Sequence, residues 1–409
     1  MSPRVIVTGL GITCPVGTGV ARAWDALVHG RSGIGPIRAF DASALRSRIA
    51  GEVRDVDPAA SLPSKLVKRT ARFIHLALLA AFEALEDAGL PPSAREGTAV
   101  VAGTGVGGFE ALEREHAAFL EKGPGRYHPL TVPMIIPNMA AGTVAMETGC
   151  RGPNLGVVTA CASGGNAVGT ALDLIRSGRC DAALAGATES TLSPFAVDGY
   201  CQLRALSTRN DEPERASRPF DRDRDGFVIA EGAAFLVLER EDRARARGAR
   251  AWAEVAGYGA SADGHHPTAP DPEGRGAVRA LEAALADARV AAEDVQVVNA
   301  HGTSTPLNDP AETRVIRRVF GAHADRLMVH ATKSMTGHAL GAAGAIAAVV
   351  AALTVARGVV HPTVNLEHPD PECDLDYVPG AAREADVRCV VTNAFGFGGH
   401  NAVLVFRKA

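Results

Sequence analysis

Cysteine is scarce in this sequence, and its cysteines follow no pattern. The seven cysteines are an odd number, they are scattered along 409 residues, and no two of them show Cys-x-x-Cys spacing. A disulfide framework would require an even set, and a zinc site closely spaced pairs. The sequence therefore predicts a protein of the reducing cytoplasm with neither kind of cross-link.

Long apolar runs and an excess of positive charge are also missing. No run reaches the roughly 18–20 residues that a membrane span needs, and the longest candidate, Gly341 to Ala356, is rich in Ala and Gly and is interpreted as a buried helix. No signal peptide is visible before the first apolar run. The net charge of −4 argues against nucleic acid as the main partner. We therefore expect a cytoplasmic protein that binds neither membrane nor nucleic acid.

The spacing of apolar residues indicates an α/β fold. Short β-branched runs alternate with longer Ala- and Leu-rich stretches, such as Arg72 to Ala88, which has helical spacing and stops at Gly89. The runs predicted to be buried strands are Val5–Thr8, Thr98–Ala102, Leu155–Thr159, Ala182–Ala185 and Phe235–Leu238.

A weak internal repeat divides the chain into two halves. A Gly-containing turn leads into a closing strand at residues 226–238 and again at residues 396–406, and a new strand pattern begins near Trp252. We therefore expect similar halves at about 1–250 and 251–409. No Pro- or Ser-rich linker lies between them, which predicts that they pack into one body.

Cys161 differs from the other cysteines in its local context. A predicted strand over residues 155–160 ends directly before it, and a predicted helix runs from it to about Ser177. The N-terminal end of a helix stabilises a thiolate, and small residues after Cys161 let a substrate approach closely. Cys161 is thus a candidate nucleophile, whereas a buried cysteine acting as a small apolar residue remains the alternative.

Two histidines follow predicted strands of the second half. His301 follows the strand pattern at residues 297–300, and His338 follows the pattern at residues 328–330, with Lys333 between. Open α/β sheets place their chemistry at such strand ends. His265 and His266 stand in a Gly- and Pro-rich stretch without nearby carboxylates, and are interpreted as solvent-facing rather than as metal ligands.

These residues lie within longer motifs. In chain order, and over nearly the whole sequence, the motifs are Thr159-Ala160-Cys161-Ala162-Ser163-Gly164, Leu206-Ser207-Thr208-Arg209-Asn210, Arg218-Pro219-Phe220-Asp221, Asn299-Ala300-His301-Gly302-Thr303-Ser304-Thr305, Lys333-Ser334-Met335-Thr336-Gly337-His338 and Asn393-Ala394-Phe395-Gly396-Phe397-Gly398-Gly399. The set resembles the signatures of β-ketoacyl carrier-protein synthases of the elongating type. It is also similar to the ketosynthase subunit of discrete polyketide synthases.

The resemblance implies a fold and a reaction. The fold would be thiolase-like, with two duplicated βαβαβαββ-type halves in a five-layered αβαβα body, and the protein would be a homodimer or a heterodimer with a chain-length-factor homologue. The reaction would be a decarboxylative Claisen condensation in fatty acid or polyketide elongation. An acyl chain moves from an acyl carrier protein to Cys161, and a malonyl-carrier thioester then loses CO₂ and attacks it.

The resemblance also implies roles for individual residues. His301 and His338 would support decarboxylation and Lys333 would assist them, with no metal and no bound cofactor, because the phosphopantetheine arm arrives on the carrier protein. The N–H groups of Cys161 and Phe397 would form an oxyanion hole, and Phe397 would also gate the site. Further residues would contact the pantetheine arm or the acyl chain: Thr303, Thr305 and Val106.

One position departs from the family pattern. Many relatives carry a buried Glu that pairs with the lysine, nine residues after the second histidine, and this chain has Ala347 there. Glu312 is a possible substitute partner for Lys333. Basic residues that match the carrier-docking face of the family are Lys65, Lys68, Arg69 and Arg204.

Three other interpretations stay open at this point. Residues 103–108 fit G-x-G-x-x-G after a strand, as in dinucleotide-binding enzymes, although the acidic residue about 20 positions later is missing. The chain could instead be a catalytically silent chain-length partner, a class that lacks the nucleophile present here. A thiolase would use a second cysteine near the C-terminus, but Cys389 lies on an apparent strand rather than in a Gly-rich turn.

Overall fold

The computed structural model describes residues 2–409 and contains one mixed sheet that runs through both halves of the chain. Along the sheet the strand order is β11-β10-β14-β15-β9-β1-β8-β7-β5-β6. The strands of the first half are β1 (Val5–Cys14), β5 (Ala99–Gly103), β6 (Asn154–Val157), β7 (Ala182–Glu189) and β8 (Gly232–Arg240). Those of the second half are β9 (Ala253–Ala262), β10 (Val297–Asn299), β11 (Met328–His330), β14 (Cys389–Gly396) and β15 (His400–Arg407).

The two halves repeat one topology. In the first half β1 pairs antiparallel with β8 and β8 with β7, while β7, β5 and β6 run parallel. In the second half β9, β15 and β14 form the antiparallel part, and β14, β10 and β11 the parallel part. The halves join where Ile6 and Val7 of β1 pair with Glu254 and Ala253 of β9. The predicted boundary at residue 250 falls in the connection before β9.

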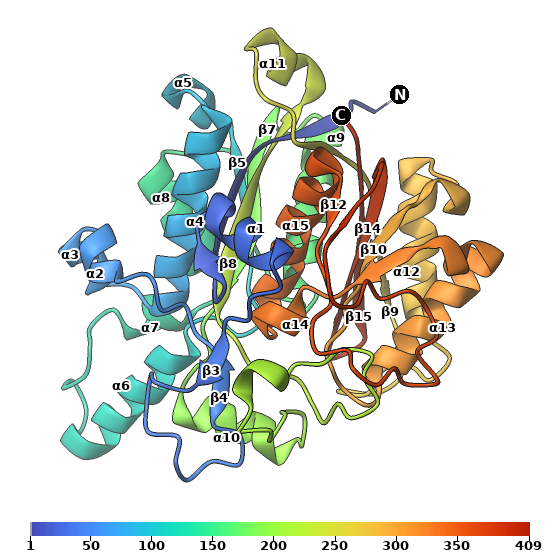
Figure 1. Cartoon of the computed structure of the whole chain (residues 1–409). Coiled ribbons are helices and arrows are strands. Elements are labelled where there is room, and N and C mark those ends of the chain that lie inside the picture. Colours follow the sequence, from blue (N-terminus) through green and yellow to red (C-terminus); the bar gives the residue numbers. More distant parts are fainter. Residues whose placement is uncertain (1) are drawn as a thin grey trace.

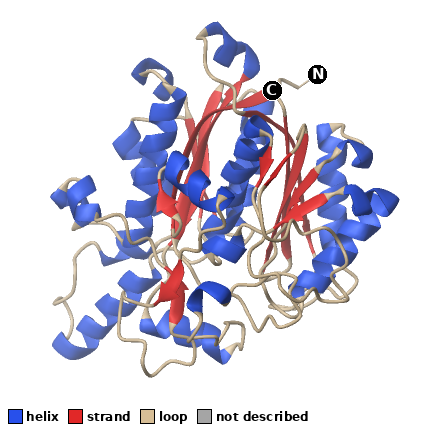
Figure 2. Ribbon diagram, in the orientation of Figure 1, coloured by secondary structure: helices blue, strands red, loops and turns tan. Residues whose placement is uncertain are grey.

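The strands of each half form one leaf of this sheet. Helices cover the outer face of both leaves and fill the space between them (Figure 1). The helices α4 (Arg72–Ala88) and α8 (Met139–Thr148) lie outside the first leaf, and α12 (Arg275–Ala288) and α13 (Asn308–Phe320) outside the second. Between the leaves lie α9 (Ser163–Arg176) and α15 (Ala343–Arg357). The strands form two groups on either side of these central helices, which gives the five layers that the resemblance implies (Figure 2).

Glycines allow the outer helices to approach the strands in the same way in both halves. A Cβ at Gly9 of β1 would lie 2.1 Å from the carbonyl oxygen of Ala84 in α4. A Cβ at Gly257 of β9 would lie 2.4 Å from the carbonyl oxygen of Ala284 in α12. The two outer helices therefore rest directly on backbone, and the matched contacts support a duplicated architecture.

The apolar segment that was interpreted as a buried helix is α15, in the middle layer. By length and composition, Leu340–Arg357 could span a membrane, but 89% of this window is buried inside the protein. Its residues Ala343 to Val355 are all buried. The central helix is therefore apolar on all sides because both leaves of the sheet cover it.

The predicted elements are present, with one error of burial. Arg72–Ala88 is a helix with the predicted bounds, and it ends because Gly89 adopts the left-handed conformation at φ 57°. The strand predicted at residues 155–159 corresponds to β6, at 154–157, but it is not buried: Leu155 is 41% exposed, and Val158, just after the strand, is 51% exposed. The reason is that β6 is the last strand of the sheet, so nothing in residues 2–409 pairs with its outer edge.

The remaining helices and strands complete the fold. They are α1 (Val20–Val28), α2 (Pro58–Ser61), α3 (Ser64–Val67), α5 (Pro92–Arg95), α6 (Phe109–Lys122), α7 (Thr131–Ile135), α10 (Pro194–Gln202), α11 (Glu241–Ala246), α14 (Lys333–Thr336), β2 (Gly17–Thr18), β3 (Ile34–Pro36), β4 (Ile49–Gly51), β12 (Val359–Val360) and β13 (Arg383–Glu384).

Candidate active site

A cavity of about 370 Å³ is lined by residues from both halves of the chain. It brings together most of the residues that the sequence singled out. Those that line it are Val106, Cys161, Arg204, His301, Thr303, Thr305, His338 and Phe397. Cys389 does not line it, and lies buried at the start of β14. The second cysteine of a thiolase is therefore not supplied by Cys389.

Cys161 stands in a tight turn between β6 and α9. Ala160, directly before it, has a φ of 50°, which is unusual for a residue other than glycine. The hydroxyl of Ser163 fixes the turn, since it donates to the carbonyl of Ala160 at 2.7 Å and accepts from the backbone N–H of Thr159 at 2.8 Å. The nucleophile candidate is thus 7% exposed and held at the cavity wall.

The thiol of Cys161 is less acidic than its place before a helix suggested. Burial raises its pKa to about 11, and the charge of Lys333 and the backbone N–H of Phe397 lower it in part. The expected stabilised thiolate is therefore wrong for the unliganded protein, because desolvation of the anion outweighs the helix terminus. The backbone N–H groups of Phe397 and of Cys161 itself lie close enough to the sulfur to lower its pKa, which places both donors beside the carbon that the sulfur would attack.

The two histidines face each other across the cavity wall. The ring centroids of His301 and His338 are 5.4 Å apart, and the rings stand at 84°. The residues are 4% and 3% exposed. Burial, with a further contribution from the charge of Lys333, lowers the pKa of both well below its usual value. Both imidazoles are therefore neutral at pH 7, and each carries one N–H that can donate a hydrogen bond.

Lys333 favours one of the two tautomers of His301. Its Nζ donates to the carbonyl oxygen of His301 at 2.6 Å and lies 3.5 Å from Nδ1 of the same residue. An ammonium group has no acceptor, so it favours the tautomer of His301 with an unprotonated Nδ1 and a protonated Nε2. Burial lowers the pKa of Lys333 to about 8, although the charge of Glu312 opposes this shift.

Glu312 does not replace the missing glutamate as a direct ion-pair partner. Its carboxylate accepts the backbone N–H of His301 at 2.7 Å, the N–H of Gly302 at 2.8 Å and the amide of Asn393 at 3.0 Å. Its oxygens are thus occupied by donors, and it forms no ion pair with Lys333. Glu312 anchors the loop that carries His301, and acts on Lys333 through its charge alone.

The remaining predicted contacts of the cavity have clear positions. The hydroxyls of Thr303 and Thr305 lie 3.0 Å apart at one wall, on either side of Ser304, whose φ is 67°. Phe397 stands in the turn between β14 and β15, ahead of Gly398 and Gly399, which both have positive φ. The turn is thus built from residues that tolerate a change of backbone angle, as a gate would need.

The G-x-G-x-x-G stretch is already occupied by a carboxylate. Glu189, fully buried, accepts the N–H of Gly105 at 2.6 Å, the hydroxyl of Thr104 at 2.9 Å and the N–H of Gly341 at 3.0 Å. A phosphate would need these donors, so the dinucleotide interpretation is wrong. This role of Glu189 could not be predicted from the sequence, because it depends on three segments that meet only in the fold.

The four basic residues predicted to dock a carrier protein fall into two places. Arg204 is exposed and lines the cavity, just after α10. Lys65, Lys68 and Arg69 are exposed on and after α3 and do not line it. None of these three forms an ion pair with another of the residues 2–409. Arg204 therefore lies in the cavity wall and the other three lie on the surface outside it, and all four are exposed to an acidic partner.

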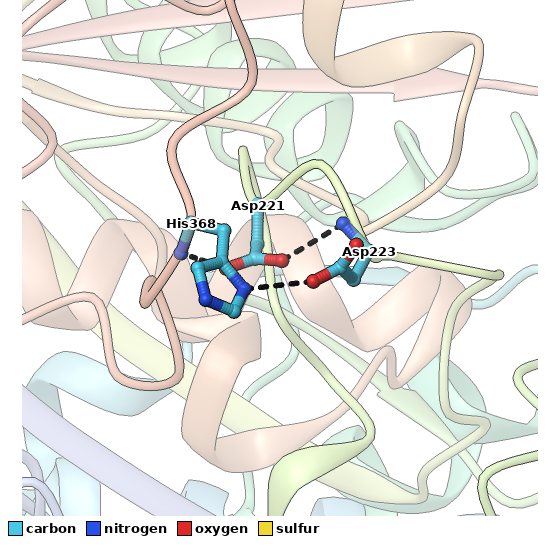
Figure 3. Close-up of side chains that lie close together, drawn as sticks. All are labelled: Asp221, Asp223 and His368. Carbon is cyan, nitrogen blue, oxygen red and sulfur yellow. Dashed lines mark hydrogen bonds and ion pairs between the residues drawn. The ribbon is translucent and has the colours of Figure 1, made fainter.

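An Asp–Asp–His group away from the cavity resembles a metal site at first sight (Figure 3). Its central carboxylate, Asp221, accepts the N–H groups of His368 at 2.7 Å, Glu367 at 2.9 Å and Asp223 at 2.9 Å. It also forms an ion pair with Arg218 at 3.0 Å. These donors satisfy Asp221 without a cation, so the group ties two loops together. His265 and His266 are both exposed, as the sequence predicted.

Several cavity residues were missed by the sequence reasoning. The hydrophobic cluster that contains Cys161 also contains Phe227 and Leu340, with Tyr200 packed against it. Thr268, in the Gly- and Pro-rich stretch after β9, lines the cavity too. A signal existed for Leu340 and Tyr200, which stand near the motifs at residues 333–338 and 206–210, whereas a loop residue such as Thr268 carries no periodic pattern.

Comparisons with known proteins agree with this geometry. The family model "Beta-ketoacyl synthase, N-terminal domain" matches residues 2–244, and "Beta-ketoacyl synthase, C-terminal domain" matches residues 252–367. The chain is 49% identical over 407 residues to 3-oxoacyl-[acyl-carrier-protein] synthase 2 of Synechocystis sp., covering 99% of this chain and 98% of that one.

Two solved structures superpose on the whole chain. One is a ketosynthase of a type II polyketide synthase in complex with its acyl-carrier protein, at 34% identity and a TM-score of 0.93. The other is the ishigamide ketosynthase/chain length factor, at 38% identity and a TM-score of 0.93. Each covers 100% of both chains.

Proposed function

Because the chain belongs to the beta-ketoacyl synthase family, we propose that it condenses an acyl group held on Cys161 with a malonyl-carrier thioester, to give a β-ketoacyl-carrier thioester and CO₂. The observation that carries this proposal is the convergence of a cysteine and two neutral histidines on one cavity. The reaction is common to fatty acid and polyketide elongation, and it needs no bound cofactor or metal.

In the first half-reaction the acyl group moves from the thiol of the carrier protein to the thiol of Cys161. The sulfur of Cys161 attacks the carbonyl carbon of the acyl-carrier thioester, and the oxygen that becomes negative accepts the N–H groups of Cys161 and Phe397. The new C–S bond forms as the bond to the carrier thiol breaks, and the proton of Cys161 leaves with that thiol. The acyl chain then lies against the cluster of Phe227, Leu340 and Tyr200.

In the second half-reaction a carbon–carbon bond forms. The carboxylate of the malonyl group leaves as CO₂, and its electron pair moves onto the thioester as an enolate. The N–H groups of His301 and His338 donate to the enolate oxygen, which neutral imidazoles can do without losing a proton. The enolate carbon attacks the acyl-Cys161 carbonyl, the C–S bond breaks, and the cysteine sulfur takes up a proton.

The partner of this chemistry is an acyl carrier protein whose arm enters beside Thr303 and Thr305. Support comes from the similar ketosynthase that was solved with its acyl-carrier protein, and from the free basic side chains described above. Carrier proteins are generally acidic, so the cluster of Lys65, Lys68 and Arg69 would attract them.

A dimer through β6 completes the proposed assembly. This strand ends the sheet with an unpaired edge, and Leu155, Val158 and the nearby Met146 are 41–66% exposed. Exposed edges of this kind are normally covered. A second copy, or the chain-length partner found with the similar ishigamide ketosynthase, would cover it. Leu155→Lys places a charge in this contact, so it should shift the protein in solution from the mass of a dimer to that of a monomer.

The alternative, a catalytically silent chain-length partner, is disfavoured because Cys161, His301 and His338 all reach the cavity. Reconstitution tests the main proposal. The purified chain, an acyl-carrier thioester and a malonyl-carrier thioester should yield CO₂ and a β-ketoacyl-carrier product, detected by mass. If neither an acyl-cysteine nor the product forms, with the dimer intact, the proposed function is wrong.

A further inference from the structure

A hydrogen-bonded chain connects the second half of the protein to the turn that carries Cys161. The hydroxyl of Tyr258 in β9 donates to Oδ1 of Asn166 in α9 at 2.6 Å. The amide nitrogen of Asn166 donates to the hydroxyl oxygen of Thr159 at 2.8 Å. Thr159 lies two residues before Cys161, so three side chains link β9 to the candidate nucleophile.

The contact between Tyr258 and α9 is closely built. A Cβ at Gly169 would lie 2.3 Å from the ring of Tyr258, so the ring occupies the space where any other residue would carry a side chain. Asn166 is 8% exposed. Burial raises the pKa of Tyr258 to about 12, so its hydroxyl keeps its proton and acts as a donor.

The chain ends on a strained piece of backbone. Ala160 is held at φ 50°, and its neighbour Thr159 makes three hydrogen bonds: with Ser163 at its N–H, with Asn166 at its side chain and with the N–H of Ala162 at its carbonyl. A residue other than glycine keeps such a φ only where its surroundings enforce it. The next peptide group carries the N–H of Cys161, one of the two proposed oxyanion-hole donors.

We propose that Tyr258 is a positioning residue, which acts through Asn166 and Thr159 to aim the backbone N–H of Cys161 at the oxyanion of acyl transfer. The inference rests on the proposed acyl transfer at Cys161. Loss of the hydroxyl of Tyr258 removes the donor that holds Oδ1 of Asn166, so the hydrogen bond from Asn166 to the side chain of Thr159 is held less firmly. Oxyanion donors work only when they are placed accurately before the reaction.

The experiment compares two Tyr→Phe variants. Tyr258→Phe should lower the rate of acyl transfer from an acyl-carrier thioester to Cys161 by about tenfold, with KM near wild type. Tyr377→Phe is the matched control, since it also removes a buried hydroxyl bonded to a side chain, that of Thr313 at 2.7 Å, in a residue that does not line the cavity. It should change the melting temperature but not the rate.

A second readout separates positioning from general loosening. Alkylation of Cys161 by iodoacetamide uses the sulfur but passes through no oxyanion, so Tyr258→Phe should leave its rate within about twofold of wild type. Thr159→Val, which breaks the last link, should give the same pattern. Combining Thr159→Val with Tyr258→Phe should add little to either single change.

The outcomes are distinguishable. A wild-type protein that forms no acyl-cysteine overturns the proposed function, and the inference falls with it. If the wild type is acylated but Tyr258→Phe is acylated as fast, Tyr258 has no positioning role. Equal losses in acyl transfer and in alkylation, or equal losses in Tyr258→Phe and Tyr377→Phe, show a purely structural role and also overturn the inference.

Discussion

The ammonium nitrogen of Lys333 lies 2.6 Å from the carbonyl oxygen of His301 and 3.5 Å from Nδ1 of the same residue. The charge that favours one tautomer of His301 also lowers the pKa of Cys161. One buried cation thus acts on the acyl-transfer step and on the decarboxylation step. No glutamate pairs with it directly, and within residues 2–409 the carboxylates whose charge favours the ammonium form are the more distant Glu312 and Asp309.

Lys333→Met tests this double role. The variant should release CO₂ from malonyl-carrier protein more slowly, because His301 loses the donor that fixes its tautomer. Alkylation of Cys161 at pH 8 should also fall several-fold, because removal of a nearby positive charge raises the pKa of the thiol. Lys68→Met, which changes an exposed lysine in the same way, is the control for both rates. Unchanged alkylation in Lys333→Met would contradict the electrostatic link.

The role of Cys161 as the acceptor of the acyl chain is tested by Cys161→Ala. The substitution removes the nucleophile and very little volume, so the fold should stay intact. Intact-protein mass after incubation with an acyl-carrier thioester should show one acyl adduct in the wild type and none in the variant. Cys201→Ala, a change at a buried cysteine of the same hydrophobic cluster, should keep the adduct. An adduct that persists in Cys161→Ala would refute the assignment.

His301→Ala and His338→Ala separate decarboxylation from acyl transfer. Each removes one N–H donor to the enolate, and the loss of one such donor typically costs roughly 10²–10³ in rate. Both variants should still take up acyl groups on Cys161 to a measurable extent. CO₂ release from malonyl-carrier protein, followed together with acylation, checks this. Normal decarboxylation in both variants would contradict the role of the pair.

The candidate nucleophile and the candidate histidines, which the structure brings to one cavity, could be predicted from the sequence because their signals are local. A strand, a cysteine and a run of small residues define the turn at Cys161, and the helix Arg72–Ala88 is bounded by its own C-terminal glycine. The features that sequence reasoning missed are set by segments far apart in the chain. Glu189 binds N–H groups from residues 105 and 341, and Glu312 those of residues 301 and 302.

Two errors have one physical origin. The burial of β6 was predicted wrongly because its position at the edge depends on the order of all the strands, which the sequence of one strand does not contain. The acidity of Cys161 was predicted wrongly because the helix terminus is visible in the sequence, whereas the burial that outweighs it is not. Both depend on what the rest of the chain places around a residue.

A buried histidine pair predicts acid sensitivity. His330 Nδ1 and His361 Nε2 are 2.9 Å apart, and burial lowers the pKa of His361 from 6.5 to about 4. The folded form therefore disfavours the charged imidazole. Protonation of His361 in the unfolded chain therefore lowers the free energy of unfolding. The loss is absent above pH 6.5 and grows as the pH falls toward 4. The free energy of unfolding should therefore be about 2 kcal/mol lower at pH 5 than at pH 8 from this group.

Urea unfolding at pH 8 and at pH 5 measures the effect of this pair. The variant His361→Gln cannot titrate at this position, so its free energy of unfolding should fall less between the two pH values than that of the wild type. His29→Gln, at an exposed histidine, should follow the wild type. If His361→Gln loses as much stability as the wild type on acidification, the pair is not the source of the sensitivity.

The last prediction concerns the cluster of Lys65, Lys68 and Arg69. These side chains are exposed and lie outside the cavity wall, so they have no route to the chemistry except through a bound partner. Exposed charges of this kind act mainly on the rate of association and are screened by salt. Lys68→Glu with Arg69→Glu should therefore raise the apparent KM for carrier-bound substrates several-fold. Turnover of a small pantetheine thioester, which does not touch the cluster, should stay near wild type.

The wild-type KM for the carrier-bound substrate should climb as salt is added, and that of the double variant should climb less. Arg318→Glu with Arg326→Glu, an equal change of charge on exposed residues of the other half, should leave the KM near wild type. Equal losses with carrier-bound and free substrates would mean that the cluster supports the fold and does not dock a carrier protein.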